Sequence, residues 1–118
     1  SLTSLYKLPH GHAVAVCLPE IWEYMLGNLD KCIDARGQVY LIKIFNLIAK
    51  AMGCDCPQQA ISVFHEMMKD MELNKPVAEK REEELRVLST SVNPVRLKNN
   101  PIFITEGDAL SLYTLIVR

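Results

Sequence analysis

The chain has 118 residues and a formal net charge of -1, and 49% of its residues are hydrophobic and 23% charged. This length suits one domain with a hydrophobic core, and the composition is that of an ordinary globular domain. The near-zero charge with scattered basic residues argues against a nucleic acid or an anionic membrane as partner, and no apolar run approaches the roughly 20 residues that span a bilayer.

The chain begins with residues 1–8, which we expect to form a loop, and it has no initiator methionine. This loop leads directly into the most specific motif of the sequence. A natural domain seldom opens on its own active-site loop. We therefore expect residues 1–118 to be one domain cut from a longer protein.

Apolar residues at helical spacing predict three helices in the first two thirds of the chain. The first covers residues 12–27 and is apolar almost all round, which predicts a buried central helix. The second runs roughly from Gly37 to Met52 and ends at Gly53. The third begins at Pro57, a residue that suits the first turn of a helix. It contains His65, which we interpret as a structural residue rather than a ligand.

Two further helices are predicted in the last third. Residues 78–88 carry a run of mixed charges, which indicates a solvated face opposite Leu85 and Leu88. A short helical turn is expected over residues 94–97. The final helix starts near Thr105, where the T-x-x-D sequence predicts a capping box with Asp108. No segment is long enough for a sheet, so we predict an all-α fold, an irregular bundle of about five helices.

The most informative stretch is Leu8-Pro9-His10-Gly11-His12-Ala13. We expect the chain to turn at Pro9 and Gly11 and then to enter a helix, which would hold the imidazole of His10 at the helix mouth. No second histidine or carboxylate elsewhere in the chain lies at ligand spacing. A metal site that used His10 would therefore need most of its ligands from outside these residues.

The cysteines predict a reducing, cytoplasmic environment, because they are too few for a disulfide scaffold. The closest two are separated by one residue, which is not the C-x-x-C of a zinc ribbon or a redox site. We interpret all four as plain thiols: Cys17, Cys32, Cys54 and Cys56. A small metal sensor using His10, His12 and a cysteine is a third and weaker hypothesis, because such sites normally gather three or four convergent ligands.

A second informative stretch lies between residues 89 and 101, where two Asn-Pro steps mark turns. Arg96 and Lys98 lie between these steps. Two interpretations remain open for them. They are either solvated loop cations or the residues that hold an anionic ligand.

The segment L-P-H-G-H-A-V-A-V at residues 8–16 resembles the C-terminal half of iron-containing (group III) alcohol dehydrogenases. The ending S-V-N-P-V-R-L-K-N-N-P at residues 91–101, followed by an acid-capped helix with L-Y, matches the same family. D-A-R-G at residues 34–37 and A-M-G at residues 51–53 are similar to the phosphonoacetaldehyde reductase-like branch. The resemblance covers essentially the whole chain, and the two ends together are more specific than P-H-G alone.

The resemblance implies a dehydroquinate synthase-like helical domain that follows a Rossmann-like, NAD(P)-binding domain. In this family iron(II), or sometimes zinc, lies between the two domains on one aspartate and three histidines. The last of these histidines corresponds to His10, while the other ligands would precede Ser1. His12 occupies a position that the family does not use as a ligand, so it would at most support one. The metal polarises the substrate oxygen during hydride transfer.

On this interpretation the chain is part of an alcohol dehydrogenase or aldehyde reductase, and by itself it neither binds NAD(P) nor catalyses a reaction. Arg96 or Lys98 would face the phosphonate of an anionic aldehyde. An apolar face left without the Rossmann-like domain would favour self-association of the fragment. The alternative from another class is a stand-alone helical module that binds a partner protein through an exposed apolar surface.

Overall fold

The structure, a computed structural model, describes all residues from 1 to 118 and is all-α. The bundle consists of five main helices, α2 (His10–Gly27), α3 (Gly37–Ala51), α4 (Pro57–Asp70), α5 (Arg81–Thr90) and α7 (Glu106–Ile116). Two short helices, α1 (Leu2–Tyr6) and α6 (Pro94–Leu97), and a 3-10 turn, η1 (Leu29–Lys31), complete the chain. The predicted fold class is confirmed. The only extended pairing is a single antiparallel bridge between Cys32 and Ile102.

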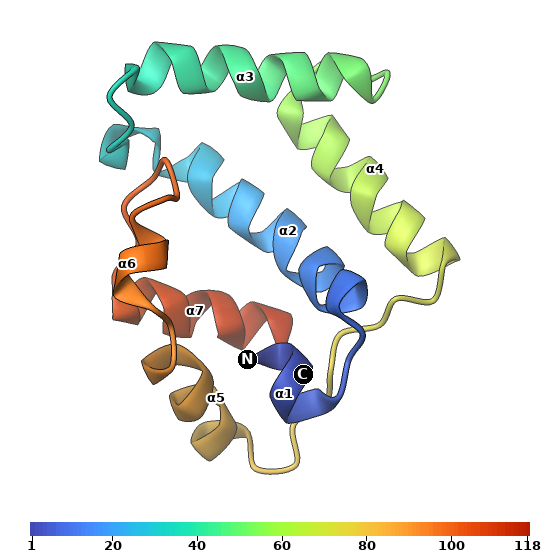
Figure 1. Cartoon of the computed structure of the whole chain (residues 1–118). Helices are drawn as coiled ribbons and strands as arrows, with labels where there is room; N and C mark the ends of the chain where they lie inside the picture. Colours follow the sequence, from blue (N-terminus) through green and yellow to red (C-terminus); the bar gives the residue numbers. More distant parts are fainter.

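Helix α2 lies at the centre of the molecule (Figure 1) and packs against α4 on one side and α7 on the other. Helix α3 packs against α4 at the edge of the molecule, and α5 pairs with α7. The short α1 lies against α2. The prediction of a buried central first helix is therefore correct in its placement, since α2 contacts three other helices.

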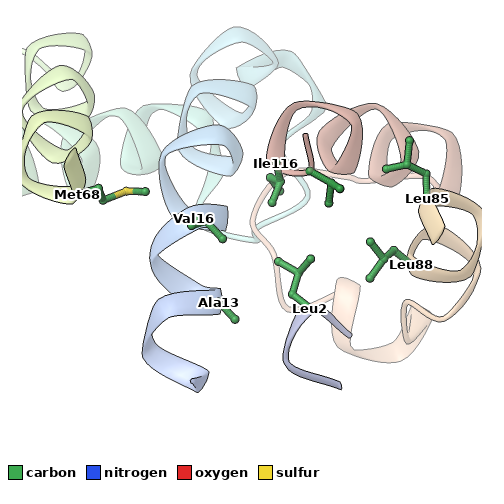
Figure 2. Packing of buried hydrophobic residues seen from close by; sticks show 8 residues of the cluster. Leu2, Ala13, Val16, Met68, Leu85, Leu88 and Ile116 are labelled. Atoms are coloured by element: carbon green, nitrogen blue, oxygen red, sulfur yellow. The ribbon is translucent and has the colours of Figure 1, made fainter. Parts of the chain in front are cut away.

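Two large clusters of buried side chains hold these helices together. In the first, Leu2 of α1 lies between α2 and the α5–α7 pair, close to Leu88 and Ile116 (Figure 2). Leu88 and Ile116 are almost completely buried, and burying a side chain of this size contributes roughly 1.5–3 kcal/mol. The second cluster surrounds Trp22 and Phe45, whose ring centroids are 6.2 Å apart. The first cluster joins the two ends of the chain.

The N-terminal segment was expected to be a loop, but residues 2–6 form helix α1. The Oγ of Ser1 accepts a hydrogen bond from the amide of Ser4 at 3.2 Å and so caps the helix. Leu2 is buried, and the hydroxyl of Tyr6 donates to Oε2 of Glu84 on α5 at 2.8 Å. A single turn is too short to show a sequence period, and these tertiary contacts stabilise it.

The helix predicted over residues 12–27 begins two residues earlier, at His10. The chain turns at Lys7, which has a positive φ of 57°, and Pro9 is extended with ψ 145°. The first helical hydrogen bond runs from the amide of Ala13 to the carbonyl of Pro9 at 3.0 Å. Gly11 is therefore part of the first helical turn and not, as expected, a turn residue before the helix.

The helix predicted over residues 78–88 is shifted and covers Arg81–Thr90. The amide of Ala78 donates instead to the carbonyl of Arg118 at 2.7 Å, which pairs this segment with the end of the chain. Oε1 of Glu84 accepts hydrogen bonds from the amides of Glu79 and Lys80 and so marks the start of α5. The other predicted boundaries are close to those observed, and the Thr105–Asp108 capping box is present.

The molecule is flat, with extents of 40 × 33 × 19 Å and a radius of gyration of 14.8 Å, against about 13.5 Å for a compact chain of this length. Its accessible surface is 7645 Å², while a compact monomer of the same mass exposes about 6,500 Å². No helix combines the length and the apolar character required to cross a bilayer.

Candidate functional site

His10 is the first residue of α2, and the turn at Lys7 and Pro9 determines where its side chain emerges. Because Pro9 has a fixed φ and lacks an amide hydrogen, it restricts the chain at the helix start without leaving a donor unpaired. The side chain of His10 is exposed. The prediction of an imidazole at a helix mouth is therefore correct, although the turn that places it lies before Gly11.

The imidazole of His10 lines an open cavity of about 570 Å³ between α1, α2 and α7. Its wall on α2 consists of residues at helical spacing, among them Val14, Cys17 and Leu18. Val14 is 48% exposed and Leu18, one turn further along the same helix face, is 41% exposed. This exposure is unusual for two neighbouring apolar side chains on a central helix. Tyr113 of α7 and the hydroxyl-bearing residues of α1 complete the wall. His10 thus stands at one end of a mostly apolar recess.

The side chain of His12 contacts a different part of the molecule from that of His10. Its Nε2 donates a hydrogen bond to the backbone carbonyl of Asn74 at 2.8 Å, since a carbonyl only accepts. This bond connects the first turn of α2 to the segment between α4 and α5. His12 does not line the cavity of His10. Its observed contact is structural, and it holds the helix start that carries His10.

A complete metal site is not formed within the chain. No group of three or more histidine, cysteine or acidic side chains is placed to hold a metal ion. Cys17 lines the same cavity as His10, but burial raises the pKa of its thiol to about 11. It is therefore protonated at neutral pH and a poor candidate for a ready thiolate ligand. The hypothesis of a metal sensor gains no support from these positions.

Arg96 and Lys98 belong to the turn around α6. Oδ1 of Asn93 caps this short helix by accepting hydrogen bonds from the amides of Val95 and Arg96. Both cationic side chains are exposed. Lys98 lines a separate cavity of about 270 Å³, whereas Arg96 lines neither this cavity nor that of His10. The structure does not bring His10 and Lys98 into one recess.

One charged pair was not anticipated from the sequence. Nζ of Lys75 donates to Oε1 of Glu20 on α2 at 3.0 Å and to the carbonyl of Leu115 on α7 at 2.7 Å. Glu20 is only 9% exposed. The signal that would have revealed it is a carboxylate in a largely apolar helix that contains only one other, Glu23, since a buried charge requires a partner. The pair ties the segment after α4 to α2 and α7.

These features define an all-α domain that presents a single exposed histidine at a helix mouth beside an apolar recess. Comparison with known proteins identifies no matching family, no matching curated protein and no matching solved structure. The functional assignment therefore depends on the motifs in the sequence and on the geometry around His10.

Proposed function

We propose that the chain is the C-terminal, metal-ligand-bearing helical domain of an iron-type NAD(P)-dependent alcohol dehydrogenase or aldehyde reductase, and that it is inactive alone. The observation that carries this function is the position of His10. Its imidazole is exposed at the start of the central helix, beside a recess in which no group of three or more potential metal ligands is gathered. An exposed imidazole of this kind is accessible to a metal ion held by a second domain.

The chemistry of the one imidazole is consistent with a metal site whose other ligands come from outside this chain. A neutral imidazole suits iron(II) and zinc, but one imidazole does not hold either metal tightly. His10 would be one ligand, and one aspartate and two histidines would come from residues beyond these 118. The metal, when bound, supplies a Lewis acid for the substrate oxygen during hydride transfer to or from the nicotinamide. His12 holds the helix start through Asn74 and so keeps His10 in place.

The partner in this proposal is a Rossmann-like domain that binds NAD(P) and covers the recess. Val14 and Leu18, both exposed beside His10, would be buried by it. The isolated chain is then expected to self-associate through this face, which sedimentation at several concentrations would detect. A chain that stays monomeric at every concentration would contradict this expectation. A reducing, cytoplasmic location suits the four unpaired cysteines.

The substrate proposed from the resemblance is an alcohol or aldehyde, and phosphonoacetaldehyde is the specific candidate. Arg96 or Lys98 would contact its phosphonate, because cationic side chains bind such oxyanions. The two cations lie outside the recess of His10, so contact would require the substrate cleft to extend to α6. An Arg96→Ala, Lys98→Ala protein with an unchanged KM for the anionic aldehyde would remove this part of the proposal.

The experiment that tests the function uses the longer protein containing this domain. We expect His10→Ala to lower metal-dependent NAD(P)H oxidation by at least about 100-fold, because even residues that only support metal ligands cost 10–100-fold. His65→Ala, which alters a half-buried histidine of α4, is the matched control and should keep most of the activity. Full activity of the His10→Ala enzyme would contradict the proposal.

A second candidate function is a stand-alone helical module that binds a partner protein. The excess of accessible surface and the exposed apolar side chains of α3, Val39 at 82% and Leu47 at 52%, favour it. The two functions differ in the encoded sequence before Ser1. A dinucleotide-binding half with an aspartate and two histidines supports the enzyme, and its absence supports the module.

A further inference from the structure

A second cavity lies away from His10, between the end of α5, the α6 turn and the start of α7. It measures about 270 Å³, and most of its wall is apolar. Two of its apolar wall residues, Ile33 and Phe103, are each about half exposed, so they form an apolar rim in contact with solvent. An open apolar rim around a recess is typical of a surface that a ligand covers.

Two charges of opposite sign line this cavity. Lys98 follows α6, and Glu106 is the first residue of α7. No salt bridge joins them, so each charge remains available to a ligand. The third polar group is Ser89, which is 4% exposed and whose hydroxyl donates to the carbonyl of Arg86 at 3.2 Å. Because that hydrogen is used, the Oγ of Ser89 can accept a hydrogen bond from a ligand.

An almost entirely apolar cavity of about 100 Å³ adjoins the first, and on its other side it shares Cys17, Ile21 and Tyr113 with the recess of His10. The two share the side chains of Val92, Leu97 and Ile104 as wall residues. A small apolar group suits such a cavity, because its almost wholly apolar wall offers water few polar partners. The larger cavity is below the roughly 300 Å³ of a typical drug-sized site and has room for a molecule of about nine non-hydrogen atoms.

We propose that this cavity binds a free aliphatic α-amino acid of the size of leucine. The carboxylate would lie at Lys98, the ammonium group at Glu106 and Ser89, and the branched side chain against Val92, Leu97 and Ile104. A fatty acid has no ammonium group to pair with Glu106, and an alkylamine has no carboxylate to pair with Lys98. A zwitterion pairs with both charges and is therefore favoured. Lys98 is also a candidate phosphonate contact in the proposed dehydrogenase, but Glu106 and Ser89 do not line the recess of His10. Leucine binding and the metal site at His10 can therefore fail independently of each other.

Calorimetric titration of the 118-residue chain with leucine tests the site. We expect saturable binding with a Kd in the millimolar range, the usual strength for so small a ligand. Isocaproate lacks only the ammonium group and isoamylamine lacks only the carboxylate, and each should bind at least about tenfold more weakly. Failure of leucine to bind at concentrations well above millimolar, or equal binding of isocaproate, would overturn the proposal.

Variants separate this site from binding elsewhere on the surface. Lys98→Met and Glu106→Gln should each weaken leucine binding at least about tenfold, because each removes one charge-assisted hydrogen bond. Lys50→Met and Glu66→Gln make the same changes at exposed positions of α3 and α4 and should leave the Kd unchanged. Unaltered leucine binding by both site variants, with circular dichroism showing folded protein, would also overturn the proposal.

Discussion

His10 and His12 are two residues apart, yet the first turn of α2 gives their imidazoles different surroundings. His10 is exposed beside the recess, while His12 donates to the carbonyl of Asn74. Adjacent positions on a helix point in directions about 100° apart per residue, so two histidines at this spacing do not converge on one ion from a single helix face. At this scale the difference between an exposed histidine and one with a structural contact depends on direction, which the residue type does not reveal.

The Asp34–Arg36 pair predicts a pH dependence of stability. The guanidinium of Arg36, 3.0 Å from Asp34, and the Arg36 amide lower the pKa of the Asp34 carboxyl to about 2. Since this pKa is below its value in the unfolded chain, the pair stabilises the fold above about pH 4, and this contribution is lost as the pH falls from about 4 to 2. Both side chains reach solvent, so the effect is small.

Thermal melts of Asp34→Asn and of the unaltered protein at a series of pH values check this dependence. We expect the variant to have the lower Tm at pH 6 and the difference to shrink as the pH approaches 2. Asp30→Asn, at an exposed aspartate outside any salt bridge, is the control. A Tm difference for Asp34→Asn that stays constant between pH 6 and pH 2 would refute the assignment.

The elements of the fold differ in how well the sequence predicts them. α3, α4 and α7 follow from apolar periodicity, from Pro57 at a helix start and from the Thr105 capping box, all of which are local signals. α1 and the start of α5 depend on partners far along the chain, such as Glu84 for Tyr6 and Arg118 for Ala78. Local patterns carry no information on these partners, so the largest errors occur at these two places, while the start of α2 is displaced by only two residues.

The salt bridge of Lys75, in the segment between α4 and α5, predicts a loss of stability when it is removed. Lys75→Met removes the partner of the buried Glu20 and should lower the free energy of unfolding by about 2–3 kcal/mol. This loss is smaller than that expected for a fully buried pair, because Lys75 is partly exposed. Lys80→Met breaks the exposed 3.9 Å contact with Glu83 and should cost less than about 0.5 kcal/mol. Urea denaturation measures both.

A double-mutant cycle identifies the cause of the loss. If Lys75 acts by compensating Glu20, the Glu20→Gln, Lys75→Met protein should lose less stability than the sum of the two single changes, because no buried charge remains unpaired. Strict additivity of the two losses would mean that Lys75 acts mainly through the carbonyl of Leu115.

At the scale of the whole molecule, the sequence predicts the fold class but not the exposed faces. Composition and periodicity indicate an all-α domain, which the structure confirms. The flat shape and the surface of 7645 Å², about 1,100 Å² above that of a compact monomer, emerge only when the helices are assembled. The position of His10 at a helix mouth was predictable because Pro9 before an apolar helical pattern is a local signal. The recess beside it was not, because α1, α2 and α7 each supply part of its wall.

The central claim is that His10 supplies one ligand to a metal site shared with another domain. Its most direct test is a calorimetric titration with zinc of this chain and of the same chain extended by the residues that precede it in the protein. We expect tight binding by the extended chain alone, and its loss in the His10→Ala version of that chain. Tight binding by the 118 residues alone, or an extended chain whose affinity is unchanged by His10→Ala, would contradict the claim.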